Sequence, residues 1–413
     1  MFQRRSRRPG LLQPQARVSG PWPLLGPAFV TAIAYVDPGN FATNISAGSA
    51  YGYLLVWVIL VSNIMAMLIQ YLSAKAGIAT GQSLPEMCRE HWPRPVVRGL
   101  WVQAEGVAIA TDLAEVVGGA LALKLLFDLP LLVGGTITAV VAFALLGLHG
   151  RNQRPFEAAI TGLLLVILVG FLYDLVLGGL QPLALAAGVV PQFDGADSIV
   201  LAAGMLGATV MPHAIYLHGS LTSRRYVADT EDERRSLLSS QRTDVVVAMT
   251  VAGLMNLTLL VIAASSLSGQ GIETIEEAHA GLGVALGSTA ALLFALSLLA
   301  SGFAASSVGT LSGQIIMEGF LRRRIPLTLR RLITLAPALG VLAIGVDPTR
   351  ALILSQVVLS FGIPFALVPL VLFTRRRDVM GSLVNRRLTT VAAAVVAAVI
   401  IALNVVLLVQ LAG

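Results

Sequence analysis

The sequence predicts an all-α polytopic membrane protein with eleven transmembrane helices, arranged as two inverted five-helix repeats plus one accessory helix. Three observations predict this fold: the composition, the long apolar stretches and the distribution of arginine. Of the 413 residues, 56% are hydrophobic and only 12% are charged, whereas charged residues make up about 25% of an ordinary globular domain. This composition suits a chain surrounded by lipid. It excludes a soluble enzyme, a disordered protein and a nucleic-acid-binding domain, despite the net charge of +6.

The first element is a tail. Residues 1–22 are basic and rich in proline and glycine, and they lack the continuous apolar core of a signal peptide. We expect a cytoplasmic N-terminal tail. The single cysteine, Cys88, excludes an internal disulfide and a multi-cysteine metal site.

Eleven apolar stretches follow the tail, each of a length that suits a membrane crossing. They lie at residues 24–49, 52–77, 96–125, 129–149, 156–179, 197–222, 242–268, 282–317, 328–346, 350–374 and 388–411. The first is interrupted by Asp37-Pro38-Gly39-Asn40 and the sixth by Met211-Pro212-His213. A proline in mid-helix removes a backbone hydrogen bond and clashes with the preceding turn, so we expect both helices to break there.

Arginine is concentrated in alternate connections between these stretches. The connections after even-numbered helices hold Arg89, Arg94, Arg98, Arg151, Arg154, Arg224, Arg225, Arg234, Arg235, Arg322, Arg323, Arg324, Arg330, Arg331, Arg375, Arg376, Arg377, Arg386 and Arg387. The other connections hold only Lys124 and Arg350 among mostly acidic residues. Basic residues mark the cytoplasmic side. The pattern therefore supports the count and predicts a cytoplasmic N-terminus and an external C-terminus.

The two broken helices are the first and the sixth, so they hold equivalent places five helices apart. A repeat of five helices must insert upside down relative to its partner. We expect a first repeat at 23–180, a second at 181–375 and an accessory helix at 376–413. Interrupted helices at matched positions of inverted repeats point to the binding site of a transporter.

The residues at the breaks predict which ligand binds there. Asp37 and Asn40 offer a carboxylate and an amide oxygen, and the break exposes carbonyls such as that of Ala34. The opposite break offers the thioether of Met211 and the carbonyl of Ala208. This mixed set suits a divalent transition metal, because Mg²⁺ and Ca²⁺ prefer oxygen alone. Mn²⁺ or Fe²⁺ is the predicted cargo, although Asp37 as a helix cap and Met211 as core packing remain alternatives.

A second polar set lies in the third stretch. Glu105, Asp112 and Glu115 are spaced by seven and three residues, which places them on one helical face. They form either a proton relay or a buried ion-pair network with Arg330 and Arg331.

Three further polar residues lie in or beside the same apolar segments. His213 follows Pro212 directly and His218 lies five residues later; they either pass protons or brace the unwound turn. Gln356 is a lone amide in the tenth stretch, either a metal ligand in some states or an interhelical hydrogen-bond partner.

The sequence resembles the Nramp (natural resistance-associated macrophage protein) family of divalent metal transporters. The resemblance rests on DPGN at 37–40 and MPH at 211–213, in the contexts AYVDPGNFATNI and GATVMPHAIYLHGSL, with ATDLAEVVG and ILSQVVLSFGIPFALVPL elsewhere. It implies a leucine-transporter-type fold. It also implies metal ligation by Asp37, Asn40, Met211 and the Ala208 carbonyl, with the Ala34 carbonyl and Gln356 joining in some conformations. For His213, Glu105, Asp112, Glu115, Arg330 and Arg331 it implies roles in proton movement and gating.

The predicted function is proton-coupled import of Mn²⁺ or Fe²⁺ across the cytoplasmic membrane. An organic-solute symporter on the same fold and a non-transporting metal sensor are the alternatives. We expect no enzyme activity and no resident cofactor, since metal and protons are substrates. The expected partners are metal ions, protons and the lipid bilayer, with no nucleic acid and no obligatory protein partner.

Overall fold

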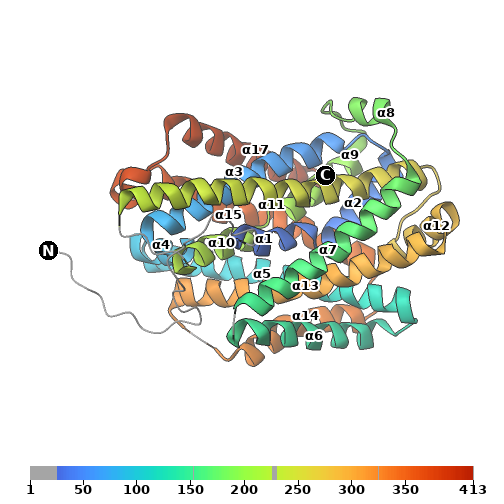
Figure 1. Cartoon of the computed structure of the whole chain (residues 1–413), viewed down its shortest axis with the longest axis horizontal. Coiled ribbons are helices and arrows are strands. Elements are labelled where there is room, and N and C mark those ends of the chain that lie inside the picture. The colour runs from blue at the N-terminus through green and yellow to red at the C-terminus, as the bar shows by residue number, and fades with distance from the viewer. Residues whose placement is uncertain (1–25, 152, 226–229, 324, 413) are drawn as a thin grey trace.

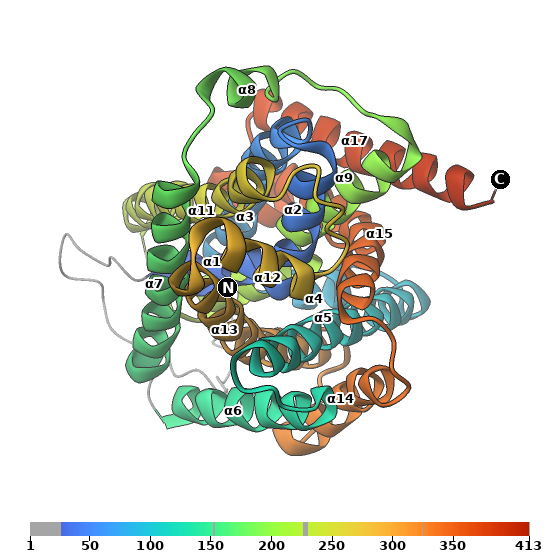
Figure 2. The ribbon, with the colours of Figure 1, turned by 90° about the vertical axis from the view of Figure 1, so that its right-hand side faces the viewer.

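Every element in the described part of the chain is a helix. The computed structural model describes residues 26–151, 153–225, 230–323 and 325–412. The predicted tail at 1–22 therefore lies outside the described residues. The long helices are packed side by side as a bundle, seen from the side in Figure 1 and from one end in Figure 2.

The first half of the chain forms nine of these elements. They are α1 (Pro27–Ala32), η1 (Ile33–Val36), α2 (Pro38–Tyr51), α3 (Val56–Thr80), α4 (Leu84–His91), α5 (Arg94–Phe127), α6 (Leu131–Arg151), α7 (Gln153–Gly178) and α8 (Pro182–Ala187).

The second half continues the bundle. Its elements are α9 (Gly195–Thr209), α10 (Pro212–Arg225), α11 (Glu231–Ser266), α12 (Ile275–Leu286), α13 (Ser288–Leu321), α14 (Leu327–Ala343), α15 (Pro348–Thr374), α16 (Arg377–Met380), η2 (Gly381–Leu383) and α17 (Arg387–Ala412).

Both predicted helix breaks are confirmed. The 3₁₀ turn η1 and Asp37 separate α1 from α2, and Val210 with Met211 separates α9 from α10. Pro38 and Pro212 each begin the helix that follows the break. Proline suits that position because its missing N–H would have no helical partner there and its fixed φ already matches a helix.

The apolar helices agree with the prediction of a polytopic membrane protein. Within the described part, eight helical segments are long and apolar enough to cross a membrane. They are Val56–Thr80, Arg94–Phe127, Ala158–Gly178, Gly195–Arg225, Glu231–Ser266, Ser288–Leu321, Pro348–Thr374 and Arg387–Val409. The segments Pro27–Val36 and Leu131–Gly147 are shorter apolar helices. The count of eleven crossings stays a prediction.

The predicted start of the apolar stretch at 282–317 was wrong. Residues up to Leu286 belong to α12, and α13 starts at Ser288. Gly287 separates them with a φ of +98°, a backbone conformation that glycine adopts without the penalty a side chain would bring. The apolar composition runs through this turn, so hydrophobicity alone did not reveal it.

The two ends of the bundle differ in charge. We call the end that holds α4, Arg224 and Arg376 the arginine end, and the opposite end, which holds α8 and α12, the α12 end (Figure 1). Viewed from the α12 end, α12 lies over the middle of the bundle, with α6 and α14 at one edge and α17 at another (Figure 2). Of the helices that carry the candidate site, α15 contacts α2, α5 and α9, and α2 also contacts α5 and α9.

Candidate metal-binding site

Asp37 lies at the first break, between η1 and α2. It is the N-cap of α2, and its Oδ1 accepts hydrogen bonds from the backbone N–H of Asn40 at 2.9 Å and from Asn40 Nδ2 at 2.7 Å. Its Oδ2 accepts a hydrogen bond from Gln356 Nε2 at 3.2 Å. Asp37 is 1% exposed. The carboxylate is therefore buried and held by uncharged donors from α2 and α15.

The second break lies directly against the first. Asn40 Nδ2 also donates to the carbonyl oxygen of Ala208, at 3.0 Å, in the last turn of α9. Met211 follows the end of α9 and is buried, as are Ala208 and Asn40. One amide group thus joins the carboxylate of the first break to a carbonyl of the second.

We call the contact between the two breaks, formed by Asp37, Asn40 and Ala208, the junction. Gln356 reaches the junction because α2 carries a glycine opposite it. A Cβ atom built at Gly39 would lie 1.8 Å from Gln356 Nε2, which is an impossible separation. On the other side, a Cβ at Gly207 would lie 2.1 Å from the Gln356 carbonyl oxygen. Both glycines therefore allow α15 to pack closely against the two breaks.

Two oxygens at the junction have no hydrogen-bond partner in the described part of the chain. They are Asn40 Oδ1 and Gln356 Oε1, both buried. A buried acceptor without a partner costs about 1–3 kcal/mol, so such atoms are rare unless they serve a ligand. The described residues hold no group of three or more His, Cys, Asp or Glu side chains with the geometry of a metal site. A site here would combine one carboxylate with amides, a carbonyl and a thioether.

Two residues that sequence reasoning missed hold the carbonyls before Asp37. Asn256 Nδ2 of α11 donates to the Tyr35 carbonyl at 2.7 Å, and Ser301 Oγ of α13 donates to the Val36 carbonyl at 2.6 Å. Asn256 Oδ1 also accepts from Asn44 Nδ2 at 3.1 Å, which links α11 to α2. The signal for Asn256 was available, since it is an amide within a long apolar stretch. Ser301 is one of many small residues in α13. Ala34 lies in the same 3₁₀ turn and is buried.

The carboxylates of α5 divide into two kinds. Glu105 forms a two-point ion pair with Arg330 of α14, at 2.9 and 3.2 Å, and Asp112 pairs with Arg331 at 2.9 Å. Both arginines are buried, at 2% and 3% exposure. The predicted common face of α5 is present, and at these two positions it carries the ion-pair network.

Glu115 is the third carboxylate of that face, and it is not part of the two ion pairs described above. It is 1% exposed, and its Oε2 has no hydrogen-bond partner in the described part of the chain. Gly118, one turn further along α5, packs so closely on Pro38 that a Cβ there would lie 2.0 Å from the proline Cβ. Glu115 is therefore one helical turn along α5 from the glycine that packs on Pro38, the residue that follows Asp37.

The two histidines of α10 are both buried and both contact neighbouring helices. His213 Nδ1 lies 3.3 Å from Thr111 Oγ1, beside Asp112 on α5, and its Nε2 has no partner in the described part. His218 Nδ1 lies 2.8 Å from Gln70 Oε1, and Gln70 Nε2 donates to the Tyr35 hydroxyl at 2.5 Å. His218 is thereby connected to the η1 turn through Gln70, which sequence reasoning did not single out.

The predicted residues thus fall into two separate groups. Asp37, Asn40, Ala208 and Gln356 are joined by direct hydrogen bonds, with Met211 next to them in sequence beyond Ala208. Glu105 and Asp112 are joined instead to α14, and no hydrogen bond described above links them to the first group.

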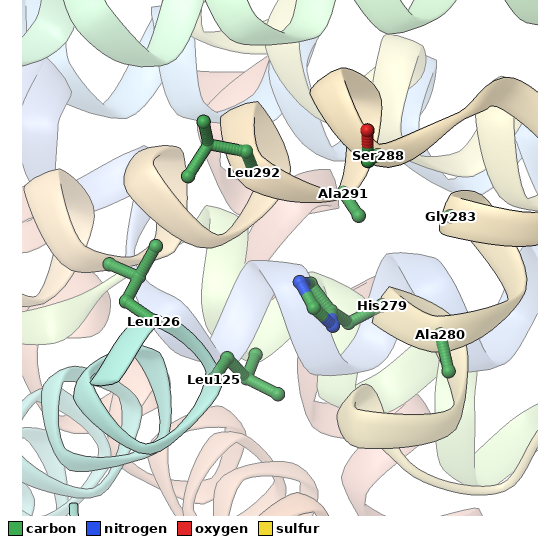
Figure 3. Close-up of a pocket in the computed structure, with 8 residues that line it drawn as sticks. All are labelled: Leu125, Leu126, His279, Ala280, Gly283, Ser288, Ala291 and Leu292. Carbon is green, nitrogen blue, oxygen red and sulfur yellow. The ribbon is translucent and has the colours of Figure 1, made fainter. Parts of the chain in front are cut away.

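A cavity of about 320 Å³ lies elsewhere, at the α12 end. Its walls are mostly apolar, from Leu125, Leu126 and Leu292 among others, and the His279 ring points toward it (Figure 3). Burial lowers the pKa of His279. With one imidazole and no carboxylate in its lining, this cavity lacks the donor set of a metal site.

Comparison with known proteins places these features in context. Residues 28–410 match the family described as natural resistance-associated macrophage protein-like. The chain is 53% identical over 394 residues to the divalent metal cation transporter MntH of Deinococcus radiodurans, which covers 95% of this chain and 90% of the relative. It is 52% identical over 391 residues to the MntH of Bacillus subtilis, with coverages of 94% and 92%.

Solved structures are similar as well. The manganese transporter of Eremococcus coleocola is 30% identical, with a TM-score of 0.86 and coverages of 96% of this chain and 89% of that one. A nucleobase-cation-symport-1 family transporter in a closed conformation is 16% identical, with a TM-score of 0.59 and coverages of 92% and 91%, a likeness that shows the fold alone. The expected leucine-transporter-type fold with broken first and sixth helices is thereby confirmed.

Proposed function

The chain belongs to the natural resistance-associated macrophage protein-like family, and from that premise we propose that it imports Mn²⁺ and Fe²⁺ together with protons by alternating access. Relatives that match over nine-tenths of both chains are divalent metal cation transporters, which supports the metal as cargo. The protons, the choice of Fe²⁺ beside Mn²⁺ and the roles of individual residues are our own proposal.

One observation carries the proposal. The Asn40 amide bridges the Asp37 carboxylate and the Ala208 carbonyl, while Asn40 Oδ1 and Gln356 Oε1 have no partner in the described part of the chain. These are the oxygens that a cation would attract. The amide nitrogens, which now donate to Asp37, would be repelled by it.

Metal binding at this junction therefore requires the two amides to turn. In the structure, N–H groups of Asn40 and Gln356 stabilise the buried carboxylate by hydrogen bonding. When a divalent ion takes over that role, the amides gain by presenting oxygen to the ion instead. The side chains that hydrogen-bond at the junction are thus the same ones that would bind the cargo.

Met211 would supply selectivity. A thioether is a soft ligand that Mn²⁺ and Fe²⁺ accept more readily than Ca²⁺ or Mg²⁺, both of which favour oxygen. Because Met211 is buried beside the junction, a hard ion there would lose a water and gain a poor ligand.

Glu115 is the residue we propose as the first proton acceptor. It is buried near the Asp37 turn, and its Oε2 has no hydrogen-bond partner in the described part of the chain, whereas Glu105 and Asp112 each form an ion pair with an arginine. From Glu115 a proton would pass along the common face of α5 by Asp112 and Glu105 toward the arginine end. His213 lies beside this route through Thr111.

We propose that the arginine end faces the cytoplasm and that the membrane is the cytoplasmic, inner membrane. This follows the positive-inside rule. It would place the N-terminus inside, the C-terminus outside and the entrance of the site at the α12 end.

Transport by purified protein in liposomes tests the proposal. Mn²⁺ uptake and internal pH should be recorded together with fluorescent indicators, while Fe²⁺, Ca²⁺ and Mg²⁺ are added as competitors one at a time. We expect Fe²⁺ to compete, Ca²⁺ and Mg²⁺ to compete poorly, and acidification to accompany Mn²⁺ entry. Uptake without acidification would leave metal transport standing and remove proton coupling.

Two variants separate the proposed relay from a structural role. Glu115→Gln should keep Mn²⁺ binding but lose metal-dependent proton entry. The double variant Asp112→Asn with Arg331→Met, which removes both charges of the buried pair, should show the same split. If either variant loses stability, metal binding and proton entry to the same degree, the carboxylate serves packing instead.

A further inference from the structure

Asp174 is a buried carboxylate that the proposed transport route does not use. It lies four residues before the end of α7, toward the α12 end, and it is 0% exposed. Neither of its carboxylate oxygens has a hydrogen-bond partner in the described part of the chain. An ionised carboxylate in that state would pay a large desolvation cost with nothing to offset it.

The neighbours of this helix face are small and polar but uncharged. A Cβ built at Gly170, one turn before Asp174, would lie 2.3 Å from Ser297 Oγ of α13, a hydroxyl that is also without a partner in the described part. One turn after Asp174, Gly178 lies close to the hydroxyls of Ser265 and Ser266 of α11. Asp174 lies on the same face between these two contacts.

Among the residues that the structure describes, no cationic side chain faces Asp174 from the helices that pack on α7. Residues 245–266 of α11, 288–313 of α13 and 27–32 of α1 hold no charged or imidazole side chain, and α6 holds such residues only at 149 and 151, at its arginine end. The other neighbour, α12, brings Glu276, Glu277 and His279.

None of the three groups of α12 neutralises Asp174. Glu276 pairs with Lys124 at 3.3 Å, Glu277 accepts from the backbone N–H groups of Glu273 and Thr274, and His279 lies against Phe294 with ring centroids 6.5 Å apart. Two of the groups are acidic themselves and would favour a neutral Asp174.

A metal ion does not fit this place. The Asp174 carboxylate and the Ser297 hydroxyl, with the two serine hydroxyls of α11 a turn away at Gly178, offer fewer oxygens than the six or so that hard cations take. The backbones of α7 and α13 are continuous helices here, so their carbonyls are used within the helix. The ligand that suits a lone buried carboxylate is a proton.

The face that carries Asp174 is in contact with the broken helix. Phe171, one turn before Asp174, packs on Phe41 of α2 with ring centroids 5.2 Å apart, and Phe41 packs on Phe294 of α13 at 5.8 Å. Phe41 directly follows Asn40 of the metal site. Figure 2 shows α2, α7, α12 and α13 together at this end of the bundle. These ring contacts connect the packing around Asp174 to the position of α2.

We propose that Asp174 is a second proton-binding site, separate from the carboxylates of α5, which takes up a proton when the α12 end closes and returns it to the same side when that end opens. In the open state the hydrated carboxyl gives its proton to water and becomes a carboxylate. Closure reverses this step, with the proton taken from water outside. This proton favours closure but is not carried across, and its effect on transport rests on the proposed alternating-access function.

Infrared spectroscopy of the purified full-length protein tests the site without any transport. At neutral pH, Asp174→Asn should remove one component of the absorption of protonated carboxylic acids. Asp194→Asn, which changes an exposed carboxylate at the same end, should remove none. An unchanged spectrum in Asp174→Asn would overturn the proposal. Asp174→Ser is a second uncharged variant, in case the first folds poorly.

Uptake in liposomes tests the consequence. Asn has the shape of a protonated Asp, so Asp174→Asn should keep Mn²⁺ affinity within about twofold, because the site lies apart from the metal ligands. Its uptake should depend less on external pH than that of the wild type. A pH dependence as steep as in the wild type would overturn the gating role. If the wild type takes up no Mn²⁺, the proposed function fails while the infrared result still decides whether Asp174 binds a proton.

Discussion

The Asp37 junction and the α5–α14 contact are both buried and polar, yet their carboxylates are stabilised by different kinds of partner. At the junction a single carboxylate is held by amides, and two acceptor oxygens have no partner in the described part of the chain. At the contact, Glu105 and Asp112 each face an arginine, and Arg331 also donates to Thr310 Oγ1 and to Ser306 Oγ. The comparison teaches that unpartnered acceptor oxygens set the junction apart, whereas at the α5–α14 contact each of the two carboxylates has an arginine partner.

The largest effect is expected from removing the charge of the junction. Asp37→Ala should weaken Mn²⁺ binding by at least about 100-fold, because it removes the only anionic ligand of the set. Calorimetry on purified protein measures this, with Asp128→Asn, an exposed carboxylate at the C-cap of α5, as the control. Mn²⁺ affinity equal to the wild type would place the metal site elsewhere.

Breaking the ion-pair contact should instead affect stability. Arg331→Ala leaves the buried Asp112 without its partner and should cost about 3–5 kcal/mol. The double variant Arg331→Met with Asp112→Asn removes both charges and should recover most of that loss. Thermal unfolding in detergent compares the two, and equal melting temperatures for the single and double variants would contradict the idea that an unpaired charge causes the loss.

Crowding the junction tests whether Gln356 matters to it. Gly39→Ala places a methyl group where Gln356 Nε2 lies, so the amide must move away from Asp37. We expect Mn²⁺ affinity to fall about tenfold, as it does when groups that position metal ligands are disturbed. Gly99→Ala on α5, where a Cβ meets open space, is the matched control. An unaltered affinity in Gly39→Ala would remove Gln356 from the site.

The smallest effect on Mn²⁺ itself is expected at the thioether. Met211→Ala should change Mn²⁺ affinity by only about fivefold, roughly 1 kcal/mol, while competition by Ca²⁺ becomes stronger. Uptake of Mn²⁺ at rising Ca²⁺ concentration gives the measurement. If Ca²⁺ competes no better than in the wild type, Met211 serves as core packing.

The sequence predicted the positions of the two breaks correctly because prolines mark both of them. Asp37 and Met211 could be singled out by their positions beside Pro38 and Pro212 within apolar stretches. The distribution of arginine then indicated which connections lie on the same side of the membrane, because basic residues are concentrated in cytoplasmic loops.

The rest depended on contacts between distant segments. The pairing of Arg331 with Asp112 joins residues 219 positions apart, and no local pattern states which carboxylate of α5 pairs with which arginine. Asp174 escaped notice because one acidic residue near the end of an apolar helix is unremarkable until its neighbours are known. The turn at Gly287 was missed because the residues on both sides of it are apolar.

The single carboxylate of the junction has an electrical consequence. The empty site carries one negative charge and the site holding a divalent ion carries one positive charge, since amides, a carbonyl and a thioether add none. In a membrane that is negative inside, voltage would draw the occupied site inward and push the empty site outward. Each charge that crosses the field is worth about 2.3 kcal/mol per 100 mV. Voltage would thus assist both halves of the cycle, and a second carboxylate at the junction would abolish this assistance to the occupied site.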